Sequence, residues 1–249
     1  MSVPRGPGRP APGRPDNAAA FSRKLRAWYR KHSRDLPWRR TRDPYQILVS
    51  ELMLQQTQVS RVLDYYPRFL SRFPTLRDLA AAAPRRVRES WEGLGYYARA
   101  RHLHELARHV TRDGNPGDLP THPEGLRALP GVGSYTAGAV ASFAYEQRVA
   151  AVDTNVARVL SRVFAPRLEP KRPRDLSRIW RIAESVLPRT GRATWTHNQA
   201  LMELGALVCT ARVARCDACP VRSECRTGRA RQAPPSRRES RPTRGAALA

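Results

Sequence analysis

The chain has 249 residues, room for one large or two small domains, and its 45 basic residues against 21 acidic ones give a formal net charge of +24. Residues 17–225 alone keep +16, a surplus that favours a polyanionic nucleic-acid partner, although 42 Arg against three Lys would also fit an Arg-rich proteome. No apolar run approaches a membrane span and no basic amphipathic helix stands out, so a membrane protein is excluded.

Residues 1–16 are rich in Pro, Gly and Arg and contain no apolar stretch. We therefore expect a disordered basic arm and not a signal peptide, and we expect the protein to stay in the cytoplasm, associated with the nucleoid. A helical pattern follows over residues 18–32, with its large apolar residues on one face.

A long helix is predicted to begin near Pro44, because Pro suits the first helical position. Its spacing places Glu51 on the same face as Ile47 and Leu54. Burial there would raise the pKa of the Glu51 carboxyl and keep it protonated near neutral pH, as a general acid requires. The alternative is a Glu that reaches solvent or pairs with one of the many Arg.

Two stretches after this helix carry groups suited to nucleic acid. Gln55, Gln56 and Thr57 can contact bases, or they form a plain solvated helix end. Residues 93–101, Gly-Leu-Gly-Tyr-Tyr-Ala-Arg-Ala-Arg, form a glycine turn whose aromatics and Arg suit base stacking and phosphate contact, although core packing is the commoner fate of a Tyr. Further helices are expected over 65–72, 76–82, 84–91 and 98–113.

Residues 129–153 indicate a helix, a tight glycine turn and a second helix. Gly131 and Gly133 bracket a turn whose amides, at the positive end of a helix over 135–144, suit one phosphate oxygen. An ordinary helix hairpin closed by glycines is equally compatible with these residues. No β-alternation of useful length appears, so the predicted fold class is all-α.

The last part of the ordered chain contains one notable Asp and a cysteine run. Asp153 precedes a periodic stretch that starts at Val156, so its first expected role is that of a helix N-cap. Helices are expected over 175–187 and 194–208. All four cysteines lie within 17 residues and are spaced Cys209-x6-Cys216-x2-Cys219-x5-Cys225.

Four thiolates without a secretion signal point to a metal centre and away from a disulfide pair. Structural zinc and an iron–sulfur cluster are both open on the residues alone. Structural zinc usually pairs two C-x-x-C-like units, whereas this run holds one C-x-x-C with wide, unequal arms.

In this order, the motifs resemble the helix-hairpin-helix DNA glycosylases that carry an iron–sulfur cluster, the endonuclease III superfamily. The resemblance covers residues 18–225 and is strongest to MutY-type adenine glycosylases. The segments that carry it are Leu36-Pro-Trp-Arg, Ser50-Glu-Leu-Met-Leu-Gln-Gln-Thr-Gln-Val, Gly93-Leu-Gly-Tyr-Tyr-Ala-Arg-Ala-Arg, Leu129-Pro-Gly-Val-Gly-Ser-Tyr-Thr-Ala-Gly-Ala, Val152-Asp-Thr-Asn-Val and the cysteine run.

The resemblance implies a two-lobed fold, a six-helix barrel plus an iron–sulfur helical lobe. The barrel with its helix-hairpin-helix would take residues 43–150. The cluster lobe would take residues 17–42 together with 151–228, and residues 229–249 would form a disordered Arg-rich tail. Asp153 would then lie at the mouth of the cleft between the lobes, facing Glu51.

The resemblance also implies the site residues. Glu51 would protonate adenine at N7, ionised Asp153 would stabilise the oxocarbenium-like sugar, and Tyr135 and Asn155 would support them. Cys209, Cys216, Cys219 and Cys225 would hold a 4Fe-4S cluster with a structural and DNA-positioning role. DNA contacts are implied at Arg39, Leu54, Gln56, Thr57, Tyr96, Gly131 and Gly133.

The implied reaction is hydrolysis of adenine from a mismatch with 8-oxoguanine or guanine in double-stranded DNA, by a monomer. Tyr135 stands where the bifunctional branch has Lys, so strong Schiff-base lyase activity is not expected. Thr154 replaces the Gly common in the family. The 24 residues after Cys225 are too few for the usual 8-oxoguanine-recognition domain, which we expect to be lacking.

Two alternatives to an adenine glycosylase remain. A mismatch thymine glycosylase acting on G·T pairs is the nearest enzyme, because a Tyr in the hairpin also occurs there. A non-catalytic helix-hairpin-helix DNA-binding module is the alternative from another class. That module needs neither Glu51 nor Asp153 near a polyanion, where each carboxylate would repel DNA.

Overall fold

The computed structural model describes residues 15–112 and 117–230, and within these ranges it is helical, with one isolated bridge between Cys209 and Ala214 in place of any strand. The all-α prediction is confirmed. The basic arm and the Arg-rich tail lie outside the described residues except for their inner ends. The elements are α1 (Ala18–His32), η1 (Pro37–Arg39), α2 (Pro44–Leu54), α3 (Val59–Arg72), α4 (Leu76–Ala81), α5 (Pro84–Ser90), α6 (Ala98–Val110), α7 (Pro123–Arg127), α8 (Ser134–Tyr145), α9 (Thr154–Phe164), α10 (Pro173–Ser185), α11 (Gly191–Leu207), η3 (Cys216–Ala218), η4 (Arg222–Glu224) and α12 (Arg226–Ala230).

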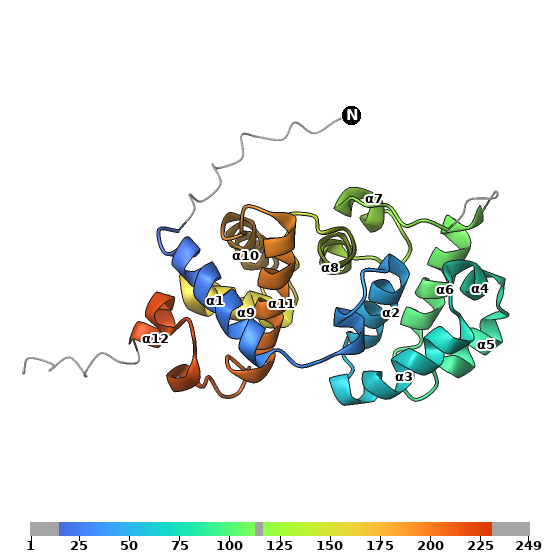
Figure 1. Cartoon of the computed structure of the whole chain (residues 1–249), viewed down its shortest axis with the longest axis horizontal. Helices are drawn as coiled ribbons and strands as arrows, with labels where there is room; N and C mark the ends of the chain where they lie inside the picture. The colour runs from blue at the N-terminus through green and yellow to red at the C-terminus, as the bar shows by residue number, and fades with distance from the viewer. Residues whose placement is uncertain (1–14, 113–116, 231–249) are drawn as a thin grey trace, which may run out of the picture.

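Two clusters of buried apolar side chains divide these helices into two groups that lie side by side (Figure 1). The first core is formed by α2 to α8, and the second by α1, α9, α10 and α11. The chain starts in the second core, crosses to the first after α1, and returns through an extended segment. Along that segment Ala150 and Val152 join the second core and Ala151 joins the first. The residue that follows, Asp153, therefore lies where the two cores meet.

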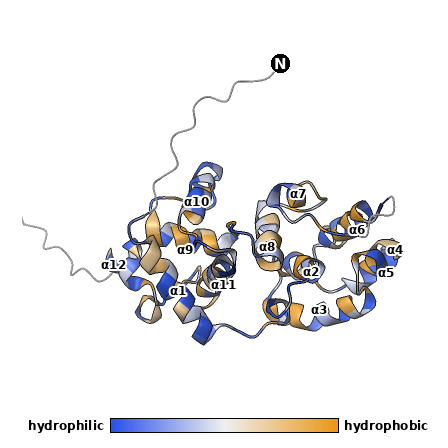
Figure 2. Ribbon diagram, turned by 45° about the horizontal axis from the view of Figure 1, so that its top comes forward, coloured by the Kyte–Doolittle hydropathy of each residue, from blue (hydrophilic) through white to orange (hydrophobic). Residues whose placement is uncertain are grey.

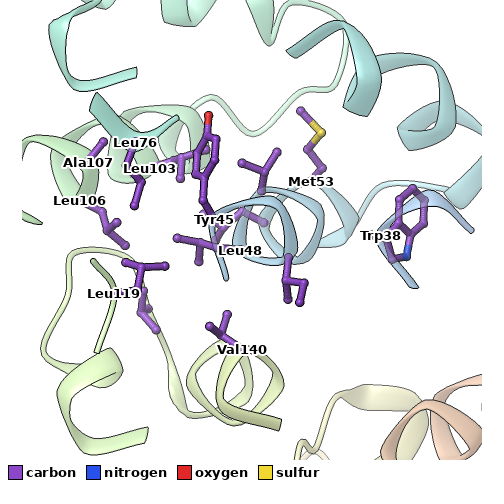
Figure 3. Close-up of a cluster of buried hydrophobic side chains, with 14 of the residues drawn as sticks. Trp38, Tyr45, Leu48, Met53, Leu76, Leu103, Leu106, Ala107, Leu119 and Val140 are labelled. Carbon is purple, nitrogen blue, oxygen red and sulfur yellow. The ribbon is translucent and has the colours of Figure 1, made fainter. Parts of the chain in front are cut away.

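Helix α2 is the centre of the first core (Figure 3). Asp43 caps its N-terminus by accepting a hydrogen bond from the Gln46 amide, and Pro44 occupies its first turn. The residues from Tyr45 to Met53 are nearly all buried, since α2 packs against α3, α6 and α8. A helix that is apolar on every side is typical of a protein core. Burying the Glu51 carboxylate on such a helix is unfavourable unless an ion pair offsets the cost or a function requires it.

The second core brings helices from the beginning and the end of the described chain together. Helix α1 packs on α11, and α9 packs on α10, α11 and α12. Phe21 of α1 meets Phe164 edge to face at 5.0 Å, and Ser22 is hydrogen-bonded to His197 at 3.0 Å. Apolar and polar residues alternate around several helices, α3 among them, as Figure 2 shows. These are amphipathic helices whose apolar faces supply the two cores.

Helix boundaries differ from the predicted ones most clearly at α3, which begins at Val59 and not at 65. Val62, Tyr66 and Phe69 share one buried face of α3, and Pro67 is accommodated inside it. Helix α6 ends at Val110, three residues before the predicted end. None of the described helices combines the length and the apolar composition that crossing a bilayer requires.

Candidate active site at the junction of the two cores

Glu51 lies in the last turn and a half of α2 and is 5% exposed. The hydroxyl of Tyr135, in the first turn of α8, donates to its Oε2 at 2.5 Å. Burial raises the pKa of Glu51 to about 7, and the nearby Asp153 charge adds to the effect, while the Tyr135 hydrogen bond and Arg39 oppose it. Glu51 is therefore shielded from solvent and forms no ion pair with any described residue, and it can hold a proton near neutral pH.

Asp153 is the N-cap of α9, as its position before Val156 predicts. Its carboxylate accepts hydrogen bonds from the Val156 amide at 2.7 Å and from the Asn155 side chain at 3.0 Å. Burial raises the pKa of Asp153 above its usual value, and these two donors and Arg158 only partly oppose the rise. The cap uses Oδ1 and the Asn155 amide uses Oδ2. Because each carboxylate oxygen can accept a second interaction, the N-cap role is compatible with a chemical role.

The two carboxyl groups come from different cores and are close enough for their charges to interact. The Tyr135 hydroxyl interacts with the charges of both carboxyl groups, and it lies 3.9 Å from the sulfur of Met202 on α11. A carboxyl group with a pKa raised to about 7 thus interacts with a second carboxyl group that accepts two hydrogen bonds. This is the arrangement by which a proton donor and a stabilising anion act on a glycosidic bond.

Arg39, for which a DNA contact is implied, lies in the interior, with its side chain 10% exposed. It donates to Glu203 at 2.7 Å, to Gln199 at 3.0 Å and to the Arg34 carbonyl at 2.9 Å. Burial alone would raise the pKa of Glu203, but hydrogen bonds from Arg34 and Arg39 lower it to about 2. Three of the five N–H groups of Arg39 are therefore used in hydrogen bonds inside the protein, and its ion pair with Glu203 joins η1 to α11.

Two turns near the end of α2 carry the other implied DNA contacts outside the hairpin. Gln56 and Tyr96 are exposed, Tyr96 at 59%, and both have left-handed backbones with φ of 56° and 49°. Leu54 is partly buried against the first core, and the Thr57 hydroxyl accepts a hydrogen bond from Arg99. Non-glycine residues in this conformation are strained, which marks the two turns as functional candidates.

The helix-turn-helix over α7 and α8 matches the predicted hairpin. Gly131 has φ of 74°, and a Cβ there would lie 2.5 Å from the Cβ of His102. Gly133, the N-cap of α8, has nothing within 4 Å of the same position and is exposed. The amides at the start of α8 are therefore open to an anion beside a glycine that no side chain covers.

The four cysteines form no disulfide with one another or with any described residue, and they line one hollow between α9, the end of α11 and α12. The guanidinium of Arg162 donates to the Cys209 sulfur at 3.2 Å, and the Gly228 amide donates to the Cys225 sulfur at 3.2 Å. Within residues 15–112 and 117–230, no group of His, Cys, Asp or Glu is gathered around a single metal-ion position. A hollow lined by four spaced thiols, with N–H donors to sulfur, fits a multi-iron cluster better than one zinc ion.

Several residues with evident structural roles at the site were missed by sequence reasoning. Arg158 donates to Asn155 at 2.8 Å and to the Cys209 carbonyl at 3.0 Å, so it connects the Asp153 end of α9 to the cysteine run. Its spacing from Asn155 was the available signal, because residues three apart share a helix face. Arg99 and Glu203 were missed as well.

Comparison with known proteins gives a consistent result. A model of the HhH-GPD superfamily of base excision DNA repair proteins matches residues 49–182. An adenine DNA glycosylase of Mycolicibacterium smegmatis is 47% identical over 208 residues, which cover 82% of this chain and 68% of that protein. The human adenine DNA glycosylase is 45% identical over 216 residues, 83% of this chain and 39% of that protein. The chain spans about two fifths of the length of its mammalian relatives, 39–42%.

Solved structures agree on the fold. A thermostable thymine-DNA glycosylase superposes with a TM-score of 0.78 at 30% identity, covering 86% of this chain and 97% of that one. An endonuclease III in a non-covalent complex with DNA gives a TM-score of 0.70 at 23% identity, over 86% and 95% of the two chains. The helical architecture of this chain is therefore the fold of these two solved structures.

Proposed function

Because the chain belongs to the HhH-GPD superfamily of base excision DNA repair proteins and, within it, to the adenine DNA glycosylase family, we propose that it hydrolyses the N-glycosidic bond of adenine mispaired with 8-oxoguanine or guanine. The observation that carries the proposal is the buried Glu51, with a pKa raised to about 7, beside a hydrogen-bonded Asp153. A DNA-binding module has no use for this pair.

In the proposed reaction, duplex DNA is held by the open amides at Gly133 and by the basic surface, and the target nucleotide leaves the stack. Neutral Glu51 gives its proton to N7 of adenine, and the bond from N9 to C1′ of the sugar breaks, so that its electron pair leaves with the base. Ionised Asp153 stabilises the cationic sugar. Glu51, now a carboxylate, takes a proton from the water that adds to C1′.

Gln56 and Tyr96 are proposed to enter the gap left by the flipped nucleotide. Both side chains are exposed on adjoining turns, and Tyr96 presents a ring that can stack on a base. Leu54 and Thr57 are proposed to contact DNA beside Gln56, and the Thr57 hydroxyl also accepts a hydrogen bond from Arg99. Arg39 uses three of its five N–H groups inside the protein, so the DNA contact proposed for it rests on the other two.

The function is tested by single-turnover base excision on duplexes with A opposite 8-oxoguanine, A opposite guanine and T opposite guanine, with alkali to reveal abasic sites. Adenine release supports the proposal. The second candidate is thymine release from G·T, which the likeness to a thymine-DNA glycosylase at 30% identity favours. Glu51→Gln should abolish release while DNA binding persists. No release by the wild-type protein on any duplex would leave only DNA binding.

We propose that Cys209, Cys216, Cys219 and Cys225 hold a 4Fe-4S cluster. The shared hollow and the N–H donors at two of the sulfurs support this assignment. When bound, the cluster would supply four iron–sulfur bonds that fix the 209–225 segment to the second core. Iron, acid-labile sulfide and zinc analysis of the purified protein distinguishes the cases. About four irons and four sulfides per chain support the cluster, and one zinc without sulfide would refute it.

The domain organisation is proposed to follow the two cores, with a barrel over 43–150 and a cluster lobe over 17–42 and 151–228. The separate apolar clusters support this division, although Leu36 and Trp38 pack in the first core. We further propose that the protein works as a monomer on mismatched duplex DNA, in association with the nucleoid.

A further inference from the structure

Arg99, the second residue of α6, is 7% exposed and lies beneath the two turns that carry Gln56 and Tyr96. On one side its Nη1 donates to the carbonyls of Leu52 at 2.7 Å and Met53 at 2.9 Å. These carbonyls belong to the last turn of α2, where a helix leaves its oxygens without intrahelical partners. Arg99 thus serves as the cap of the helix that carries Glu51.

The same guanidinium holds both turns. Nη1 donates to the Gln55 carbonyl at 2.6 Å and Nη2 to the Thr57 hydroxyl at 3.2 Å, on either side of Gln56. Nη2 also donates to the Gly95 carbonyl at 2.9 Å, directly before Tyr96. Gln56 and Tyr96, the two residues with left-handed backbones, therefore both adjoin residues that are hydrogen-bonded to Arg99.

Rigid coupling of this kind requires an arginine. The guanidinium presents five N–H groups in a fixed plane, whereas an ammonium group has three donors at one point and reaches fewer acceptors at once. The strained backbones of Gln56 and Tyr96 persist only if their surroundings hold them. In this structure the shared element that does so is Arg99.

We propose that Arg99 is a positioning residue that joins the two turns and the end of α2 into one rigid wedge. Gln56 and Tyr96 then enter DNA as a unit, in fixed register with Glu51. Arg99 itself is buried and does not touch the substrate. The inference deepens the proposed function, and it rests on that function only for its activity readout.

The first test reads the coupling without activity. Hydrogen exchange of the full-length protein is compared for wild type, Arg99→Lys and the control Arg108→Lys. Arg108 lies on the same helix and also donates to a carbonyl, that of Ala80, but away from the turns. We expect Arg99→Lys to speed exchange in residues 55–57 and 94–97 together by at least tenfold, with α8 and the second core unchanged. Acceleration in one turn only, or in neither, would overturn the proposal.

A milder variant tests whether Arg99 couples the two turns even if Arg99→Lys does not fold. Thr57→Val removes one acceptor of Arg99 and leaves the arginine in place. Because Arg99 links the turns, we expect exchange to rise in residues 94–97, although within the described residues the side-chain hydrogen bonds of Thr57 go to Gln55 and Arg99 and not to that turn. Unchanged exchange there would show that the turns move independently.

The activity readout separates positioning from general loss of structure. With saturating protein, single-turnover excision by Arg99→Lys should fall at least tenfold, whereas affinity for an undamaged duplex should change less than threefold. Equal losses in both would indicate a merely structural role and contradict the proposal. Absence of excision by wild type would refute the proposed function, and the exchange experiment would still test Arg99.

Discussion

Glu51→Gln should make the protein more stable at neutral and alkaline pH while it removes activity. Burial raises the pKa of Glu51 from 4.5 to about 7. Below about pH 4.5 the carboxyl is neutral in both the folded and the unfolded chain, and its burial costs nothing electrostatic. Between about pH 4.5 and 7 the unfolded chain releases the proton and the folded chain keeps it, so wild-type stability falls as pH rises.

The size of this effect follows from the pKa difference. At about 1.36 kcal/mol per pKa unit, the cost reaches roughly 3 kcal/mol above pH 7 and is constant thereafter. Gln at position 51 avoids that cost but buries an amide N–H₂ without an assured partner, at about 1 kcal/mol. We therefore expect a net gain of about 2 kcal/mol for Glu51→Gln at about pH 8.5, and a small loss at about pH 4.5.

Urea unfolding at several pH values between about 4.5 and 8.5 measures the difference between the two proteins. The change of this stability difference with pH matters more than its size at any one pH, because the pH dependence isolates the titration of Glu51. Glu105→Gln is the matched control, since Glu105 is exposed on α6 with Arg101 as its partner, and such pairs contribute little. A difference between wild type and Glu51→Gln that does not vary with pH would refute a raised pKa, and with it the acid role of Glu51.

Four further substitutions test the site. Asp153→Asn should keep the helix cap, because Asn caps as well as Asp, and should change the free energy of unfolding by less than about 0.5 kcal/mol. Single-turnover excision should nevertheless fall at least 100-fold. Activity equal to that of wild type would remove Asp153 from the mechanism. Tyr135→Phe deletes a hydrogen bond that lowers the pKa of Glu51, so the alkaline fall of the excision rate should move to higher pH, and a shift to lower pH would contradict this. Gly131→Ala should cost about 1–3 kcal/mol in thermal or urea unfolding, because it combines a left-handed φ with a 2.5 Å contact, whereas Gly133→Ala meets no atom within 4 Å and should cost under about 1 kcal/mol. Equal effects of the two glycine substitutions would exclude the packing explanation.

Helical spacing was sufficient for some parts of this site. The face shared by Ile47, Glu51 and Leu54 indicated a carboxyl group among apolar residues, and the position of Asp153 before an apolar repeat indicated an N-cap. Both depend on contacts within a few residues, for which the helical period is a direct guide. The same is true of the glycine turn between α7 and α8.

Contacts between distant segments could not be predicted in this way. Tyr135 donates to Glu51 across 84 residues, and Arg39 reaches Glu203 across 164. Three arginines stand at positions 39, 40 and 42, and no local pattern says which one turns inward. For Arg99 a signal did exist, because it shares a helix face with Leu103 and Leu106, both buried, while Arg101 is exposed.

The route of the chain between the two cores has a consequence for how the protein is made. Ser22 of α1 must meet His197 of α11, a partner 175 residues later. At about 5–20 residues per second, a ribosome needs roughly 10 to 35 s to synthesise that interval. Throughout this time the apolar face of α1, with Phe21 and Leu25, lacks its final cover. The first core can close meanwhile, so α1 is synthesised before that core and buried after it. Nascent chains stalled before α11 should be held by chaperones through α1.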